Sequence, residues 1–298
     1  MNYVLNGRIL EIDINSIFCK TIQEFFDNFI PSKKYQHLLI QNKWINIDNK
    51  QVKREDLIIG DKLCINIYPS ENIYKEINNN KLDIVYEDEL CIIVNKPKGV
   101  LVHSDGNNEI TLTDYVKSYY KDKSYVDIQP IHRLDKDTTG LVMFSKSIIF
   151  QPLLDSMLSK KDIRRYYLAF VKGKAKIDDT LVINKPIGKD RHNPNSRIVS
   201  ETGQNALTKA KCIGSKNGLS VFRCFLDTGR THQIRVHLSH ISYPIINDEL
   251  YGIKDERLVR MGLIADELEF YHPLKEDTIK VEANMPNDVE RLLNEVLD

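Results

Sequence analysis

The segment from Ile131 to Val142 decides the fold and reads IHRLDKDTTGLV. A charged loop opens here directly into an apolar run with the composition of a buried strand. Two carboxylates and two cations lie within five residues, 133–137. Loops held by a rigid sheet often carry reactive groups, and a neighbouring cation keeps an aspartate ionised and oriented. The segment therefore predicts an active-site loop that presents a carboxylate; the alternative is a salt-bridged surface turn.

The elements around this loop predict an α+β domain. Residues 82–99 contain two β-rich runs around an acidic turn, which indicates a hairpin. Further strands are expected at 141–145, 166–171 and 219–226. Residues 111–120 carry apolar side chains at helical spacing, and a second helix is expected over residues 232–241 with Thr231 as its N-cap. Residues 82–298 therefore predict a mixed, mostly antiparallel sheet with few helices.

A smaller unit is expected before this domain. Its predicted helices and strands follow in the order 21–29, 33–41, 44–47 and 63–67. This order resembles the alpha-L RNA-binding module of a small-subunit ribosomal protein, which implies an α/β RNA-binding-like domain over residues 1–70. The segment holds 9 basic and 8 acidic residues, so it lacks a strong charge for RNA, and a structural cap is the alternative. The polar stretch 71–81 is the expected linker.

The charge of the chain is balanced overall but unevenly distributed. The 298 residues carry no formal net charge, and a hydrophobic content of 42% is ordinary for a globular protein. Residues 116–176 hold 13 basic and 6 acidic side chains, whereas residues 254–298 hold 6 basic and 12 acidic ones. The basic centre would attract phosphates. The alternative is a solvated, lysine-rich surface.

The cysteines and the hydropathy indicate a cytoplasmic protein. Five cysteines form no C-x-x-C pair, which favours a reducing compartment and disfavours a disulfide framework or a zinc ribbon. No apolar run approaches the roughly 20 residues of a membrane span. The first residues, MNYVLNGRILEID, lack the basic start and long apolar core of a signal peptide.

Several ordered blocks resemble one enzyme family. The run His132 to Asp135, followed by Asp137 to Leu141, is similar to the signature of the large-subunit-type ribosomal RNA pseudouridine synthases. Further matching blocks, in the order of the family, are Asn95–Gly99 with Val102 and His103, Arg165–Gly173, Gly229–His237, and Arg260–Met261 with His272–Pro273. The matches extend from about residue 82 to residue 275 and imply the pseudouridine synthase fold.

The resemblance implies a role for individual residues. Asp135 is expected to be the catalytic carboxylate, and Tyr167 the aromatic ring that stacks on the target uracil and helps to move the proton on carbon 5. Arg235 is expected to be the buried ion-pair partner of Asp135. Arg133 is expected to help extrude the target base, and Ile234 to pack on the uracil.

Four more residues complete the expected set of substrate and RNA contacts: His132, Arg230, Lys96 and Arg165. The chain also departs from the family pattern. Arg165 replaces a lysine and keeps the charge, and Ile264 stands where a histidine is common. Ser242 and Asn247 stand where glycines are usual, which predicts a reshaped turn because Ser in particular tolerates a left-handed backbone poorly.

The implied reaction is the isomerisation of uridine to pseudouridine in RNA. Cleavage of the glycosidic bond requires a group that stabilises or captures positive charge at the sugar, and one ionised carboxylate can do either. Attack at the sugar and elimination therefore both remain open. The basic run after Ser159 would hold the RNA backbone. Isomerisation consumes nothing external, so no cofactor and no metal are implied.

Three alternatives compete with this interpretation. The first is a non-catalytic RNA-binding or ribosome-assembly factor on the same fold, which the presence of Asp135, Tyr167 and Arg235 disfavours. The second is a glycosidase acting on small nucleosides. The third is a zinc site at His232, His237 and His240, but their spacing does not fit a metal-binding helix. Ribosomal RNA is the expected partner, transfer RNA the alternative, and a monomer is expected.

Overall fold

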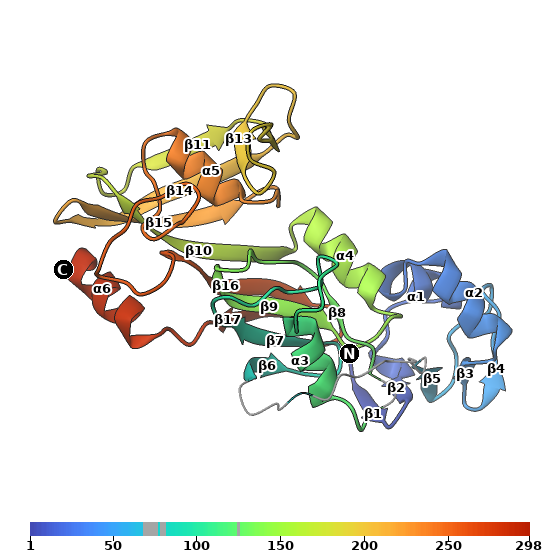
Figure 1. Cartoon of the computed structure of the whole chain (residues 1–298). Coiled ribbons are helices and arrows are strands. Elements are labelled where there is room, and N and C mark those ends of the chain that lie inside the picture. Colours follow the sequence, from blue (N-terminus) through green and yellow to red (C-terminus); the bar gives the residue numbers. More distant parts are fainter. Residues whose placement is uncertain (68–76, 78–81, 124–125) are drawn as a thin grey trace.

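A computed structural model describes residues 1–67, 77, 82–123 and 126–298. Figure 1 shows a small N-terminal unit, with two helices and its own sheet, beside a larger body built on a long curved sheet. The predicted linker over residues 71–81 lies outside the described residues, apart from residue 77. Each of the two units has a sheet of its own, and a two-stranded sheet of β12 (Ile187–Lys189) and β13 (Arg197–Val199) is separate from both.

The N-terminal unit is a five-stranded antiparallel sheet packed against two helices. In sheet order its strands are β1 (Tyr3–Asn6), β2 (Ile9–Asp13), β5 (Lys62–Asn66), β3 (Ile45–Ile47) and β4 (Lys50–Gln51). The helices α1 (Ile22–Phe29) and α2 (Lys33–Gln41) lie where they were predicted. Thr21 caps α1, because its Oγ1 accepts a hydrogen bond from the Glu24 amide at 3.2 Å. The hairpin of β1 and β2 was not predicted.

A ten-stranded sheet forms the larger body. Along its main path the strands are β11 (Thr180–Asn184), β14 (Leu207–Lys216), β15 (Leu219–Leu226), β10 (Ile163–Lys172), β16 (Leu263–His272), β9 (Thr139–Ser145), β7 (Cys91–Lys96) and β6 (Asp83–Glu87). Off this path, β17 (Asp277–Glu282) pairs with β16 and β8 (Gln129–Pro130) pairs with β9. Within the described residues β9 and β16 are the one parallel pair, so the mixed, mostly antiparallel sheet is confirmed.

Gly140 makes the parallel contact possible. It lies at the start of β9, opposite Ala265 of β16. Its φ of +110° is rare for any residue with a side chain, and a Cβ atom there would lie 2.1 Å from the Ala265 carbonyl oxygen. Glycine is therefore the residue that allows the active-site loop to run directly into the middle of the sheet.

In the described part of the larger body, four helices accompany this sheet: α3 (Leu112–Tyr119), α4 (Gln151–Lys160), α5 (Gln233–His240) and α6 (Asn287–Leu297). A short hairpin of β12 (Ile187–Lys189) and β13 (Arg197–Val199) lies beside α5. The expected N-cap of α5 was wrong. His232, not Thr231, is the N-cap, with a left-handed φ of +59° and no side-chain cap hydrogen bond. The reason is tertiary, because this backbone turns the His232 ring toward the site described below.

The two units share one apolar core on their facing sides. This core joins residues of the N-terminal helices, such as Phe26, to residues of the larger sheet, such as Met143 and Phe270. Polar contacts lie at its edge. The Tyr3 hydroxyl donates to Glu89 at 3.2 Å, and the N-terminal amino group lies 3.3 Å from Glu276. The N-terminal unit is therefore docked on the side of the sheet occupied by α4.

Candidate active site

The loop that carries Asp135 connects β8 to β9 and is anchored by Lys96. The Lys96 ammonium group donates to the carbonyl oxygens of Pro97, Val100 and Lys136, at 3.0, 2.8 and 2.8 Å. Burial lowers its pKa to about 8, although Asp137 and Asp135 oppose the shift. Lys96 was expected to contact RNA. In the structure it is 1% exposed and joins the loop after β7 to the Asp135 loop by hydrogen bonds.

Asp135 and Arg235 meet across 100 residues of sequence. The Arg235 Nη1 atom donates to Asp135 Oδ2 at 2.9 Å. Asp135 keeps 24% of its side-chain surface exposed, whereas Arg235 keeps 7%. Among the described residues, hydrogen bonds to the Asp135 carboxylate fall on Oδ2 and none on Oδ1. The carboxylate is thus held by one oxygen and presents the other.

Asp248 fixes the arginine from the opposite side, and sequence analysis did not find it. Its two oxygens accept from Arg235 Nε and Nη2 at 2.7 and 2.8 Å, which is a bidentate pair. Burial alone would lower the pKa of Arg235, but the hydrogen bonds to Asp248 and the charge of Asp135 outweigh burial and raise it. The guanidinium group therefore stays charged and has a single orientation.

The predicted turn before Asp248 keeps a glycine-like backbone without glycine. Ser242 and Asn247 have φ values of +66° and +57°. The Asn247 side-chain amide donates to the carbonyl oxygens of Asp255, Leu258 and Arg260, and its oxygen accepts from the Asp255 amide. These bonds offset the cost of the left-handed backbone. The turn is thus held rigidly beside the clamp.

His232 and Tyr251 form a second layer around the pair. The Tyr251 ring lies under the Arg235 guanidinium group, 5.2 Å from it. Its hydroxyl lies 2.9 Å from His232 Nδ1 and accepts from the Arg197 amide at 2.6 Å. The other ring nitrogen, His232 Nε2, lies 4.0 Å from Asp135 Oδ2. Sequence analysis considered His232 for a metal site alone and missed this contact.

Tyr167 and Ile234 contribute the apolar part of the site. They are 4% and 3% exposed and belong to the same apolar cluster, together with Leu134 of the Asp135 loop. Burial raises the pKa of Tyr167; Arg165 opposes this and the charge of Asp135 adds to it. Its hydroxyl makes no hydrogen bond to any residue in the described part of the chain. The phenol is therefore neutral near pH 7.

The other predicted residues divide between the rim and the interior. Arg133 is exposed and its Nη1 atom lies 3.0 Å from His103 Nε2. His132 is instead buried and accepts a hydrogen bond from the Met143 amide at 3.3 Å, and burial and then Arg165 lower its pKa to about 3. Neutral His132 thus anchors the Asp135 loop to β9 through the Met143 amide.

Ile264 lies away from Tyr167. It packs with Leu168 and Val289 in the apolar cluster under α6, whereas Tyr167 belongs to a different cluster. A histidine is common at this position in the family, so its replacement changes packing on the α6 side. The cluster that contains Tyr167 and Ile234 does not include it.

A basic groove runs close to the site. It encloses about 170 Å³ and is lined by cations together with aromatic rings, including Lys161, Arg164, Arg165, Tyr166 and Phe225. Arg165 connects it to the site, because its guanidinium group lies near Gly229 and its charge acts on the Tyr167 hydroxyl. Arg230 is exposed on the same loop as Gly229 and donates to the Asn205 carbonyl oxygen at 3.1 Å.

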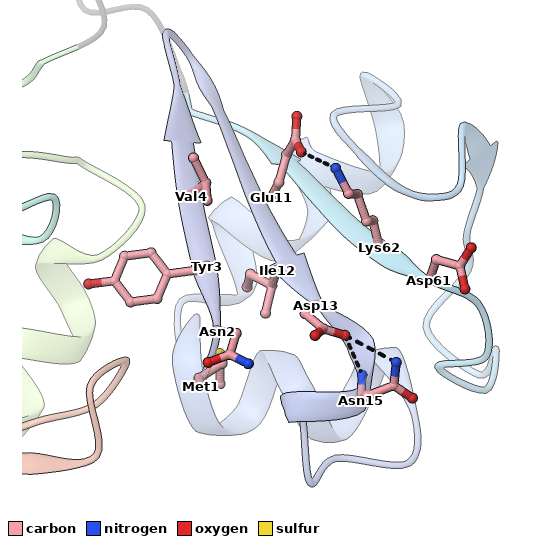
Figure 2. A pocket seen from close by; sticks show the side chains of 10 residues that line it. All are labelled: Met1, Asn2, Tyr3, Val4, Glu11, Ile12, Asp13, Asn15, Asp61 and Lys62. Atoms are coloured by element: carbon pink, nitrogen blue, oxygen red, sulfur yellow. Dashed lines mark hydrogen bonds and ion pairs between the residues drawn. The ribbon is translucent and has the colours of Figure 1, made fainter.

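A larger groove, of about 550 Å³, lies elsewhere, on the N-terminal sheet. Figure 2 shows that its polar side chains pair with one another, as Glu11 does with Lys62, while Tyr3 points away toward the larger body. Asp13 and Asp61 also line it. A groove rich in carboxylates disfavours phosphates. It contains none of the residues around Asp135 and is not considered the active site.

Among the described residues, no cluster of three or more His, Cys, Asp or Glu side chains that could hold a metal ion occurs. In the same part of the chain, no helix is both long and apolar enough to span a membrane.

Comparison with known proteins now identifies the family. Residues 90–240 match the family model described as RNA pseudouridylate synthase. An uncharacterized RNA pseudouridine synthase of Bacillus subtilis, YhcT, is 34% identical over 96% of this chain and 97% of its own length. The chain belongs to the RNA pseudouridylate synthases. It is therefore an isomerase that acts on RNA.

Other relatives in this family are similar over nearly the whole chain. The ribosomal large subunit pseudouridine synthase D of Neisseria meningitidis is 35% identical over 94% of this chain and 78% of its own length. The protein of the same name from Escherichia coli is 30% identical over 97% and 93%. Two solved human proteins share the fold. RNA pseudouridylate synthase domain-containing protein 1 has a TM-score of 0.57 and 19% identity, over 74% of this chain and 96% of its own. Protein 4 of the same name has a TM-score of 0.58 and 20% identity, over 71% of this chain and 92% of its own.

Proposed function

We propose that this synthase isomerises specific uridines of large-subunit ribosomal RNA, with Asp135 as the catalytic carboxylate. The names of the relatives from Neisseria meningitidis and Escherichia coli support this substrate. One observation supports the catalytic role above all others. Asp135 is held through Oδ2 by an arginine that is itself clamped, while Oδ1 accepts no hydrogen bond from the described residues. Transfer RNA is the alternative substrate.

This geometry suits cleavage of a glycosidic bond. A carboxylate that keeps its charge in a half-buried site can capture or stabilise the positive charge that develops at the sugar. The clamped Arg235 places a positive charge beside Asp135 and fixes its direction before substrate arrives, so little reorganisation is required during the reaction. Attack at carbon 1 of the sugar and an elimination path both use the same free oxygen.

Tyr167 and Ile234 would hold the uracil after it separates from the sugar. The base must rotate without escaping, which requires flat and apolar walls. The proton on carbon 5 must leave when the new carbon–carbon bond forms, and nitrogen 1 gains a proton. Because Tyr167 is neutral near pH 7, it would take part as a phenol that passes a proton on, not as a tyrosinate.

The rim residues would bind the RNA around the target. Arg133 is an exposed cation two residues before Asp135 and is suited to occupy the space that the extruded base leaves. Arg230 and Arg165 would contact phosphates on either side. Further cations of the basic run would extend this surface: Lys160, Lys161, Arg164, Lys172 and Lys174. Tyr166 and Phe225 offer rings on which bases can stack.

We also propose a division into residues 1–70, a linker over residues 71–81 and a catalytic domain over residues 82–298. The separate N-terminal sheet supports it, with two helices in the order typical of alpha-L modules. A monomer in the cytoplasm would suit the unpaired cysteines of the chain and a ribosomal RNA substrate.

The test is pseudouridine mapping by carbodiimide labelling of total RNA, from cells with and without this gene. We expect one or a few sites in large-subunit ribosomal RNA to disappear, and to return with the wild-type gene but not with Asp135→Asn. Missing sites in transfer RNA alone would overturn the proposed substrate. An unchanged map, with purified protein that still binds RNA, would favour a non-catalytic RNA-binding factor.

A further inference from the structure

His232 lies between a chain of hydrogen bonds and Asp135. The chain begins at the β12–β13 hairpin, where the Arg197 amide donates to the Tyr251 hydroxyl at 2.6 Å. It continues to His232 Nδ1, 2.9 Å from the same hydroxyl. His232 Nε2 then faces Asp135 Oδ2 at 4.0 Å. Three separate parts of the fold thus meet at one histidine.

The direction of these bonds favours one tautomer of His232. A phenol has one proton to donate, and an amide can only donate. Because the Arg197 amide occupies a lone pair of the Tyr251 oxygen, the phenol proton is free to point at His232 Nδ1. Nδ1 is then an acceptor, so in the neutral ring the proton lies on Nε2. Nε2 is the nitrogen that faces Asp135.

The ring is held neutral by its surroundings. Burial lowers the pKa of His232, with Arg235 and Arg197 acting in the same direction and Asp135 and Asp248 opposing them. The charged and titratable groups that face it therefore come from its own helix, the Asp135 loop, the hairpin and the Asp248 turn, together with Tyr251. A neutral donor can hydrogen-bond a carboxylate without adding a second positive charge to it.

We propose that His232 is a positioning residue for Asp135, which donates from Nε2 to Oδ2 when the RNA closes the site. This inference rests on the proposed role of Asp135. At 4.0 Å the contact is too long for a hydrogen bond in the free enzyme, and such bonds often form only in the substrate complex. Two donors would then hold Oδ2, Arg235 and His232, and Oδ1 would remain directed at the sugar.

The hairpin makes this arrangement sensitive to bound RNA. Its loop, residues 190–196, and its flanks carry Lys189, Arg191, His192 and Arg197 against a single carboxylate, Asp190. RNA phosphates that bind these cations would pull on the hairpin and shift its position. The hairpin contacts Tyr251 through the Arg197 amide. A shift of the hairpin would therefore change the hydrogen bond between Tyr251 and His232, which orients the His232 proton.

The first test reads the tautomer directly. Selective ¹⁵N labelling of histidine distinguishes a protonated from an unprotonated ring nitrogen by NMR, and the His232→Leu spectrum assigns the signals. We expect a single Nε2–H tautomer in the wild type at neutral pH and a mixture in Tyr251→Phe, which keeps the ring under Arg235. An Nδ1–H tautomer in the wild type would overturn the proposal.

The second test measures the reaction. RNA transcribed from the large-subunit ribosomal RNA gene of the source organism, with tritium on carbon 5 of uracil, releases the label on isomerisation. We expect His232→Leu to lower the single-turnover rate about ten-fold with unchanged RNA affinity, because one hydrogen bond to a charged group is lost. His232→Gln, which keeps an N–H donor, should recover part of the rate.

The controls separate this proposal from the proposed function. Tyr271→Phe, on an exposed ring of β16, should change neither the spectrum nor the rate. A full rate in His232→Leu would overturn the positioning role. An equal loss in Leu and Gln variants with weakened RNA binding would indicate a merely structural histidine and would also overturn it. Absence of tritium release from the wild type would count against the proposed function, whereas the tautomer is read without turnover.

Discussion

Two pairs of aspartate and histidine side chains lie within 4.0 Å of each other in the described part of the chain, and they are built in opposite ways. Asp88 and His272 lie 2.8 Å apart, and their side chains are 3% and 0% exposed. Asp135 and His232 lie 4.0 Å apart and are 24% and 14% exposed. The same two residue types therefore form a closed pair at one end of the sheet and an open one at the other.

In the closed pair, donors surround the Asp88 carboxylate. Asp88 accepts from the amides of Leu90 and Cys91 at 2.9 Å each, from the Tyr86 hydroxyl at 2.5 Å, and from Lys275. Burial alone would raise the pKa of Asp88, but the hydrogen bonds from His272, Tyr86 and the Cys91 amide outweigh burial and lower it. Such a carboxylate has no capacity left for a substrate.

The open pair is held from one side. Asp135 accepts from Arg235, and the remaining hydrogen bonds of that arginine go to Asp248. If Asp135 has the proposed catalytic role, the difference indicates what distinguishes a reactive carboxylate from a structural one within a single domain. Asp135 keeps lone pairs and exposed surface for a substrate and Asp88 does not, whereas both have a histidine beside them.

The largest expected effect is that of Arg235→Met. This change leaves Asp135 and Asp248 buried without their cation, so we expect a loss of about 3–5 kcal/mol in the free energy of unfolding. Tritium release should fall by about 10³-fold or more, because the carboxylate loses both its orientation and its counter-charge. Urea denaturation and single-turnover assays measure the two effects. Activity close to that of the wild type would show that Asp135 needs no clamp.

Asp88→Ala tests the closed pair in the same way. It leaves His272, Lys275 and two amides without their acceptor, and we expect a loss of about 3–5 kcal/mol in the free energy of unfolding. The kcat/KM of the folded enzyme should not change, because Asp88 does not contact the residues around Asp135. The variant is therefore assayed at low temperature, where it remains folded. A selective loss of turnover would remove the distinction drawn between the two pairs.

Prediction from sequence is most specific where one segment carries its own pattern. The family blocks single out Asp135, Tyr167 and Arg235, whose catalytic roles stay predictions, and the structure places Arg235 against Asp135. Asp248 was missed because the spacing along the chain does not reveal which side chains meet. The physical signal was nevertheless present. A buried arginine has five N–H donors, so a single carboxylate could not satisfy it.

The same limit applies to the secondary structure. Strands with long alternating or apolar runs, such as β10 and β15, were predicted within a few residues. The hairpin of β1 and β2 was missed because each strand is only 4 or 5 residues long, too short for a clear period. The cap of α5 was wrong because local propensity favours Thr231, whereas the contact with Tyr251 and Asp135 requires His232 at that position.

The dependence of the free energy of unfolding on acidic pH is a smaller expected effect of the closed pair. The folded-state pKa of Asp88 is lowered from an unfolded value of about 3.9. Its stabilising contribution is therefore complete above that value and is lost as the pH falls below it. Between about pH 5 and pH 3 we expect the wild type to lose about 1 kcal/mol more than Asp88→Asn. Urea denaturation at the two pH values measures this difference, and equal losses would contradict the lowered pKa.

The smallest expected effect comes from two matched tyrosines. Tyr86 donates to Asp88 of the closed pair, and Tyr251 contacts His232 of the open pair. Each Phe variant removes one hydroxyl and keeps the ring. Tyr86→Phe should lower the free energy of unfolding by about 1 kcal/mol and leave turnover unchanged. Tyr251→Phe should instead lower turnover with little change in RNA affinity. If both variants change the same quantity, the closed pair is not specific to stability and the open pair is not specific to turnover. If Tyr86→Phe changes stability alone and Tyr251→Phe changes turnover alone, the difference between the two aspartates also holds for the tyrosines that contact each pair.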